Sequence, residues 1–283
     1  MQTLNVSEFC NRIALHPPYF AFSDLYHEHS QGVRGRFCAE HQTGYESGPV
    51  SAAELVRHLA ALGTCAAVIE DSLTPTYYLG TKGRLKVLRN MPGDMGRGEF
   101  HAFSEVLSRD RKTLVAHSTA TRGQYLAHFS CEYQSLPAPV FSRTFKHYRT
   151  TPSTPPAGSP YREPIELDFE PAQADSLVAH SRPLPDSRFA GHFLEYPAWP
   201  ASLYCETVSR VAGKLLHHML EDEVQFSVAR MDIDALRLIS ASQNVSFHLT
   251  CTSASKLLSR YVFRGEVRHA DLLACVIEME VYV

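Results

Sequence analysis

The sequence lacks the cysteine pattern, leader and apolar runs of several protein classes. Its seven cysteines are scattered, odd in number and form no Cys-x-x-Cys pair, which favours reduced thiols over a disulfide framework. The N-terminus has neither the basic start nor the apolar core of a signal peptide. No apolar run approaches the roughly 20 residues that a membrane span requires. We therefore expect a soluble, cytoplasmic protein with no membrane span.

A strong charge of one sign is also missing. The net charge is −3 and no Lys/Arg cluster is interleaved with aromatic residues, so nucleic acid is not an expected partner. The absence of a Gly-x-Ser-x-Gly turn disfavours a serine hydrolase. What the chain does have is 283 residues with 44% hydrophobic content, enough for one large core or two cores of ordinary domain size.

A segment rich in Pro, Ser and Thr divides the chain into two parts of similar size. It spans residues 150–164 and has no hydrophobic periodicity, as expected of a linker stiffened by proline. We therefore predict an N-terminal unit at 1–149 and a C-terminal unit at 165–283. Each unit shows short strands, one apolar helix and then several long strands, a two-copy α+β architecture.

The C-terminal unit has the clearer pattern. Pro200 can occupy the start of a helix, and Ala201–Leu220 keeps the apolar spacing of one buried helix face. Four strand candidates follow, and they alternate apolar and polar residues as half-buried antiparallel strands do. These candidates are Gln225–Leu236, Val245–Thr252, Leu258–Arg264 and Ala270–Val283.

The N-terminal unit is predicted largely by analogy with the second one. Its helix is expected at Ser51–Glu70, where Ser51 and Glu54 have the spacing of a capping box. The strand candidates after that helix are Thr76–Leu79, Leu85–Leu88, Glu99–Ser108, Lys112–Thr121 and Gln124–Tyr133.

One histidine and one carboxylate stand out before and within the second helix. His192 lies on a Gly-containing turn, and Glu206 follows fourteen residues later. A histidine and a carboxylate brought together around a helix N-terminus suit general acid–base chemistry on an acyl carbonyl.

The same stretch resembles a known family. The run Phe189-Ala-Gly-His-Phe, with Pro197-Ala-Trp-Pro-Ala, Glu206 and Gly213 after it, is similar to the hot-dog fold 3-hydroxyacyl-thioester dehydratases of fatty acid and polyketide synthesis. The resemblance covers about residues 185–283. It implies a double hot-dog fold, in which two antiparallel sheets are each wrapped round a long central helix.

The sequence departs from that family at three positions. Leu194 stands where the family has Pro, and Glu195 stands where it has Gly. Ala201 replaces a Gly whose backbone N–H holds the thioester carbonyl, and alanine keeps that N–H.

The N-terminal unit keeps another form of the same turn, with His41, Gly44 and Pro49 in the order His-x-x-Gly-x-x-x-x-Pro. The position fourteen residues after His41 is not a carboxylate. The nearby polar residues are Glu54 and His58, which share a helix face at i, i+4.

The resemblance implies two pseudo-sites, because sites of this family combine the histidine of one unit with the carboxylate of the other. One pseudo-site pairs His41 with Glu206, and the second pairs His192 with His58 or Glu54. Both stay open: the first pair has the better acid–base chemistry, which favours it slightly, and the second has the better turn.

The family mechanism implies dehydration of a 3-hydroxyacyl thioester to a 2-enoyl thioester. A helix N-terminal N–H at Val50 or Ala201 would hold the carbonyl. The histidine would take the α-proton and Glu206 would protonate the departing hydroxyl. The expected substrate-binding residues are Gly44, Pro49, Val50, Pro200 and Ala201. No metal and no cofactor are expected.

The expected partner is an acyl thioester on acyl carrier protein or coenzyme A, and exposed sheet edges suggest a homodimer. Two alternatives remain because fold does not fix reaction. One is a hot-dog thioesterase or enoyl isomerase; a thioesterase would use the carboxylate to activate water. The other is a catalytically silent subunit that binds acyl chains or an active partner.

Overall fold

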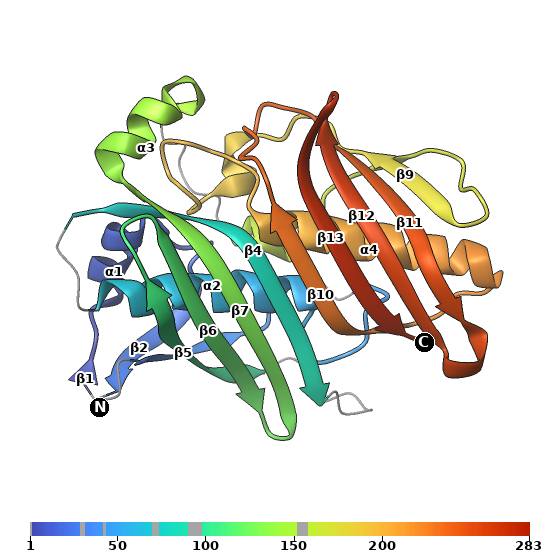
Figure 1. Cartoon of the computed structure of the whole chain (residues 1–283), viewed down its shortest axis with the longest axis horizontal. Coiled ribbons are helices and arrows are strands. Elements are labelled where there is room, and N and C mark those ends of the chain that lie inside the picture. Colours follow the sequence, from blue (N-terminus) through green and yellow to red (C-terminus); the bar gives the residue numbers. More distant parts are fainter. Residues whose placement is uncertain (1, 29–31, 42–43, 70–73, 90–97, 152–157) are drawn as a thin grey trace.

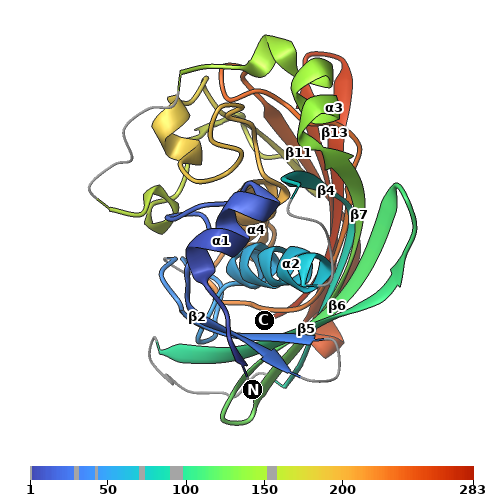
Figure 2. The same cartoon turned by 90° about the vertical axis from the view of Figure 1, so that its left-hand side faces the viewer.

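Two long helices lie along one face of a single antiparallel sheet (Figure 1). The computed structural model describes residues 2–28, 32–41, 44–69, 74–89, 98–151 and 158–283. Within these ranges, thirteen strands pair in the order β1-β2-β3-β5-β6-β7-β4-β10-β13-β12-β11-β9-β8. Figure 2 shows the sheet curving around one side of the helices α1, α2 and α4. The α+β class was predicted, but the two predicted sheets are one continuous sheet.

The helices are α1 (Val6–Ile13), α2 (Ala52–Val68), α3 (Ala138–Thr144) and α4 (Ala201–Leu220). The strands before the predicted linker are β1 (Gln2–Thr3), β2 (Phe22–Glu28), β3 (Gly32–Cys38), β4 (Thr76–Arg89), β5 (Glu99–Arg109), β6 (Thr113–Arg122) and β7 (Tyr125–Pro137). The strands after it are β8 (Asp168–Phe169), β9 (Ser176–His180), β10 (Ser227–Ala235), β11 (Ser246–Ser255), β12 (Arg260–His269) and β13 (Leu272–Tyr282). Short 3-10 turns lie at η1 (Lys146–Tyr148), η2 (Pro160–Arg162), η3 (Asp186–Phe189) and η4 (Lys256–Leu258).

Both long helices occur where their apolar periodicity predicts them. The helix α4 begins at Ala201 and ends at Leu220, as predicted. The helix α2 begins after its N-cap Ser51, whose Oγ accepts a hydrogen bond from the Glu54 N–H at 3.2 Å. It ends at Val68, and Glu70 lies outside the described residues. The two helices pack against each other and against the sheet, because their apolar faces are the surfaces that must leave water.

The predicted long strands are present, with one difference in the N-terminal part. The two short candidates Thr76–Leu79 and Leu85–Leu88 belong to one fourteen-residue strand, β4. Its register with β7 shifts between Gly80 and Lys82, and this irregularity hides the continuity of the strand in the sequence. The sequence did not predict α1 or α3.

The two halves of the sheet meet where β4 pairs with β10. Met231 lies opposite Leu85 on this seam, and both side chains are buried. One residue further, Asp232 lies opposite Arg84, an opposite-charge pair of the kind that stabilises neighbouring strands. This seam makes one sheet out of the two that were predicted.

The predicted linker is in part a packed segment. Residues 152–157 of it lie outside the described residues, but 158–164 do not. Tyr161 is 1% exposed, and its hydroxyl donates to the Ala190 carbonyl at 3.0 Å. We call residues 158–165 the covering segment, because they lie over polar side chains that extend from α2 and α4.

Candidate active site

The first turn of α2 holds the backbone around His41. The buried Glu54 carboxylate accepts hydrogen bonds from the backbone N–H groups of Glu40 at 2.7 Å and His41 at 3.2 Å. Glu54 therefore binds a preceding loop instead of completing the predicted capping box. The His41 ring is 4% exposed, and neither ring nitrogen has a hydrogen-bond partner among the described residues. Burial lowers the pKa of His41 to about 3, so the ring is neutral at pH 7.

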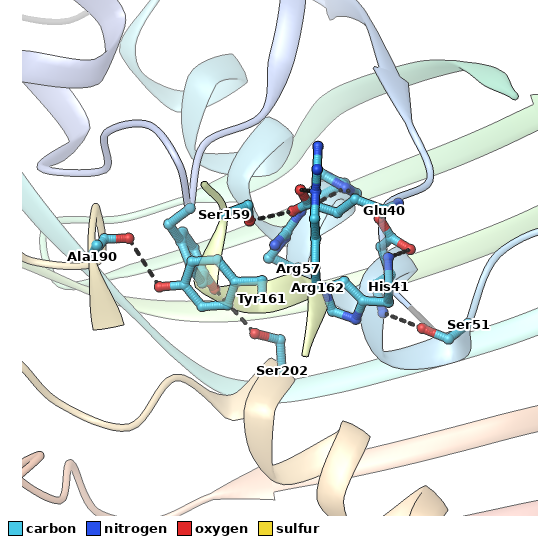
Figure 3. A network of polar contacts seen from close by, with 12 residues as sticks. Glu40, His41, Ser51, Arg57, Ser159, Tyr161, Arg162, Ala190 and Ser202 are labelled. Atoms are coloured by element: carbon cyan, nitrogen blue, oxygen red, sulfur yellow. Dashed lines mark hydrogen bonds and ion pairs between the residues drawn. The ribbon is translucent and has the colours of Figure 1, made fainter. Parts of the chain in front are cut away.

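Arg57 lies beside this histidine at the α2–α4 interface and is fully buried. Its Nη2 donates to Glu40 and lies 3.1 Å from the His58 Nε2. Its Nε and Nη1 have no partner in the described part of the chain. The guanidinium stacks over the Tyr161 ring at 4.9 Å, and Figure 3 shows Glu40 placed between Arg57, Ser159 and Arg162.

Glu206 reaches the same region from α4. Its side chain is buried, and Oε2 has no hydrogen-bond partner among the described residues. Burial raises the pKa of Glu206 to about 7, although Arg188, Arg210 and Arg57 act in the opposite direction. Arg57 and Arg188 also lower the pKa of His41. The charges of Arg57 and Arg188 thus act on both Glu206 and His41, and no hydrogen bond joins these two residues in the described part of the chain.

The covering segment closes over this region through backbone contacts. Arg188 donates to the Glu163 carbonyl, and Arg210 donates to the Ile165 carbonyl. Ser159 donates to the Glu40 carboxylate at 3.0 Å. We call Glu206, His41 and Arg57, enclosed in this way, the Glu206 centre.

The second predicted pair is not brought together. His58 stacks on Phe37 with ring centroids 4.1 Å apart, and Glu54 is bound to the loop before α2. Neither residue lines the pockets that His192 lines. Within the described residues, His192 thus has no acidic or imidazole partner.

His192 is instead positioned by a tight turn. Gly191 has φ +85°, and a Cβ added there would lie 2.0 Å from the His16 carbonyl oxygen, so only glycine fits. The His192 Nδ1 lies 3.2 Å from the Ala198 carbonyl oxygen, which makes Nδ1 the protonated nitrogen. Burial lowers the pKa of His192 to about 3, so the imidazole is neutral, with Nε2 as an acceptor.

Two adjoining pockets open beside His192, with empty volumes of about 600 Å³ and about 580 Å³. Both are lined by Ala201, the first residue of α4, and we treat them together as the α4 pocket. Pro200, the N-cap, provides no side-chain cap. The N–H groups of Ala201 and Ser202 have no hydrogen-bond partner in the described ranges. Of the predicted substrate-binding residues, Pro200 and Ala201 lie here.

The other predicted substrate-binding residues lie before α2. Gly44 is exposed on a turn with φ +59°, and Pro49 and Val50 are buried. The resemblance had implied that the Val50 N–H is an N-terminal donor of this helix. The helix begins only at Ala52, so the Val50 N–H is not one of its donors.

A buried carboxyl that the sequence analysis did not identify, that of Glu46, binds the N-terminus of α2. Glu46 accepts a hydrogen bond from the Ala52 N–H at 2.6 Å and another from the Ser209 hydroxyl at 3.1 Å. Burial raises its pKa to about 7. In the sequence, Glu46 is an ordinary polar residue of a turn. Arg57 and Tyr161 were missed for the same reason, because only their tertiary surroundings distinguish them.

One group of side chains in the described residues has the spacing of a metal site. Ligand atoms of Glu40, His41 and Glu54 lie within 4.8 Å of one another. However, Glu54 is used by backbone N–H groups, and Glu40 is used by Arg57 and Ser159. A buried guanidinium beside these ligands opposes a cation, so we assign no metal here.

The similarity of this chain to known proteins lies in its fold. No family model and no curated protein sequence matches it. Many solved structures do match, among them the tesB protein of Mycobacterium avium subs paratuberculosis, with 12% identity, a TM-score of 0.60, and coverage of 91% of this chain and 95% of that one. The acyl-CoA thioesterase II TesB2 of Mycobacterium marinum has 12% identity and a TM-score of 0.54, with 98% and 97% covered. An acyl-ACP thioesterase of Bacteroides thetaiotaomicron has 10% identity and a TM-score of 0.54, with 90% and 100% covered.

These likenesses establish the hot-dog fold for this chain. They also correct the expected activity. Most of the similar structures bear the names of thioesterases, which are hydrolases, so the expected dehydratase, its lyase class and its place in fatty acid or polyketide biosynthesis are contradicted. The physical reason is that the dehydratase-like turn specifies how a hot-dog helix begins, whereas the reaction depends on side chains from both helices.

Proposed function

We propose that this protein is an acyl thioester hydrolase whose reaction takes place at the Glu206 centre. In this proposal the chain is a double hot-dog, with units at 1–149 and 165–283 joined by 150–164, and α2 and α4 are the two central helices. The observation that carries the proposal is the buried Glu206 carboxyl with a pKa of about 7 and an unpartnered Oε2. A carboxylate with such a pKa is suited to act as a general base at neutral pH.

Hydrolysis also requires donors for the oxyanion and a group that positions the attacking water, and residues near Glu206 would supply both. Arg57 has two buried nitrogens without partners, Nε and Nη1, and buried donors of this kind are costly unless a ligand or water binds them. They would donate to the thioester carbonyl oxygen and to the oxyanion that forms there. The neutral His41 ring, also unpartnered, would hold the attacking water.

The reaction balances with these residues alone. Glu206 takes a proton from water as the water oxygen bonds to the carbonyl carbon. The oxyanion then reforms the carbonyl, the carbon–sulfur bond breaks, and the departing thiolate takes the proton from Glu206. The products are a carboxylic acid and a thiol. A histidine is not required as a base in this scheme, which agrees with the lowered pKa of His41.

Coenzyme A and acyl carrier protein both present the acyl group on a pantetheine phosphate. Arg188 and Arg210 are half-buried beside Glu206, at the thioester end of that pantetheine arm, where their charge would favour the ionised form of the base. The described part of the chain includes no helix with the length and apolar composition of a membrane span. A cytoplasmic location and association into a homodimer remain predictions.

The test is mass spectrometry of octanoyl-CoA and of octanoyl acyl carrier protein incubated with the protein. Wild type should release octanoic acid with a rate that rises about tenfold per pH unit below pH 7 and then levels off. Glu206→Gln should lower the rate by roughly 10²–10⁴-fold, whereas Glu221→Gln, at the exposed end of α4, should leave it unchanged. Undiminished acid release by Glu206→Gln would overturn the assignment of the base. Intact thioesters with wild type across chain lengths would overturn the proposed activity.

A further inference from the structure

The α4 pocket is lined by residues with polar groups that take no part in the proposed hydrolysis at the Glu206 centre. Trp199 and Tyr204 are each 2% exposed and line this pocket. Neither the Trp199 Nε1 nor the Tyr204 hydroxyl has a hydrogen-bond partner among the described residues. Buried donors without partners are rare in native proteins and call for a ligand or an ordered water.

The N-terminus of α4 adds two more donors to the same pocket. The N–H groups of Ala201 and Ser202 have no partner in the described ranges, and no acidic residue occupies the first turn. A helix start carries about half a positive charge and favours an anion. Four residues that line the α4 pocket thus carry hydrogen-bond donors without a partner in the described ranges: the Trp199 indole N–H, the Tyr204 hydroxyl and the backbone N–H groups of Ala201 and Ser202.

The charges that line the pocket have one sign. Its described lining includes Lys82 and the exposed Arg237 but no Asp or Glu. His192 is the histidine among the described lining residues, and its imidazole is neutral. Lys82 is ion-paired with Glu132, whose Oε2 lies 3.6 Å from its Nζ, so Arg237 is the cation on which the carboxylate site relies.

The deeper part of the pocket is apolar. Its walls come from α2, β4, β7 and β10 and include Leu15, Val56, Ala60, Phe129 and Ile233. A ligand that satisfies both parts has a negatively charged oxygen group at one end and an aliphatic chain at the other.

We propose that the α4 pocket binds a free aliphatic carboxylate as a second ligand site, separate from the Glu206 centre. The carboxylate oxygens accept from Trp199, Tyr204 and the first N–H groups of α4, Arg237 lies at the carboxylate end, and the chain extends along the apolar wall. A carboxylic acid is also what thioester hydrolysis releases, so the site would let the protein respond to its own product. The binding site itself does not depend on the proposed hydrolysis.

The sequence contains one tryptophan, Trp199, so its fluorescence reports on this pocket without any activity assay. Octanoate and the neutral isostere octanamide should be titrated against the protein. We expect a saturable change with octanoate and at least tenfold weaker binding of octanamide. Tyr204→Phe and the surface change Arg237→Gln should each weaken octanoate binding severalfold. The matched control Tyr261→Phe, a buried tyrosine outside the pocket, should not.

Glu206→Gln separates this proposal from the proposed function. It should lower hydrolysis by roughly 10²–10⁴-fold and leave the octanoate titration unchanged. Equal affinity for octanoate and octanamide would overturn the carboxylate site in favour of an apolar pocket, and an unchanged Trp199 signal at all ligand concentrations would overturn it altogether. Loss of octanoate binding in Glu206→Gln would overturn the claim that the two sites are separate.

Discussion

The beginnings of α2 and α4, the two long helices, are capped in different ways. At α2, Ser51 caps the Glu54 N–H and the Glu46 carboxyl accepts from the Ala52 N–H. At α4, the N-cap is Pro200, which has no side-chain acceptor, and no acid stands in the first turn. The start of α2 is bound by one protein carboxyl and one hydroxyl, whereas the first residues of α4 line a pocket.

This difference gives the two long helices different surroundings at their N-termini. A helix N-terminus attracts an acceptor or an anion. Where the chain supplies its own carboxyl, as Glu46 does, the helix start is satisfied and the neighbouring residues Arg57 and His41 keep the unpartnered groups. Where the chain supplies none, the N–H groups of the helix stay available to a ligand.

The largest effect is expected when the guanidinium of Arg57, which extends from α2, is removed. We expect Arg57→Met to lower thioester hydrolysis by roughly 10²–10³-fold, because the oxyanion loses its preorganised donors. Arg57→Lys should recover only part of the rate, since lysine lacks the planar fork of donors. The measurement is acid release by mass spectrometry with octanoyl-CoA.

The octanoate titration of Trp199 serves as the fold control for these variants and should be unchanged. The exposed change Arg182→Met should affect neither measurement. Hydrolysis at the wild-type rate in Arg57→Met would show that Arg57 serves only to neutralise Glu40.

A smaller effect is expected on how the free energy of unfolding depends on pH, through Glu46 at the N-terminus of α2. Burial raises the pKa of Glu46 to about 7, so the folded state holds this proton more tightly than the unfolded state. The stability that this group contributes is therefore present below its unfolded pKa and is lost as the pH rises to about 7. Glu46→Gln should equal wild type below about pH 4.5 and exceed its free energy of unfolding by roughly 3 kcal/mol at pH 8.

Urea unfolding at several pH values measures this difference. His41 and His192, with lowered pKa values, act in the opposite direction below pH 6.5 but cancel in the comparison of variant with wild type. The exposed control Glu223→Gln should show no such divergence. A constant difference between Glu46→Gln and wild type across the pH range would contradict the buried, protonated carboxyl.

The smallest expected effect tests the two caps directly. Ser51→Ala should lower the free energy of unfolding by about 1 kcal/mol, because the Glu54 N–H loses its acceptor. Pro200→Ser should raise it by a few tenths of a kcal/mol, since the new cap exceeds what proline contributes through the unfolded state. Thermal or urea unfolding measures both, and losses of equal size at the two positions would remove the asymmetry.

Much of the architecture was predictable because it depends on local periodicity. The helix α4 was predicted with its observed limits, and β10 to β13 were predicted to within a few residues, because their apolar spacing is that of one buried face. The strand β4 was predicted as two pieces, since its register irregularities interrupt the alternation. The single sheet was not predicted, because strand pairing between β4 and β10 joins residues far apart in the sequence.

The candidate site was predictable only in part. His41 and Glu206 were named from a motif and a spacing, and both lie around Arg57 and Arg188. Pairing His192 with Glu54 or His58 was also considered, and the structure separates them because Glu54 binds the loop before α2. Arg57, Glu46 and Tyr161 carry no motif, and Tyr161 belongs to a segment whose composition indicates a linker.

The positions of α2, α4 and most of the long strands, and the turn that precedes α4, could be predicted from the sequence, because they follow from residue spacing and backbone preference within a few turns of chain. Only the tertiary structure decided which polar groups are buried together and which remain without partners. Burial is a property of the assembled helices and sheet, and it changes a common glutamate such as Glu206 into a carboxyl with a pKa of about 7.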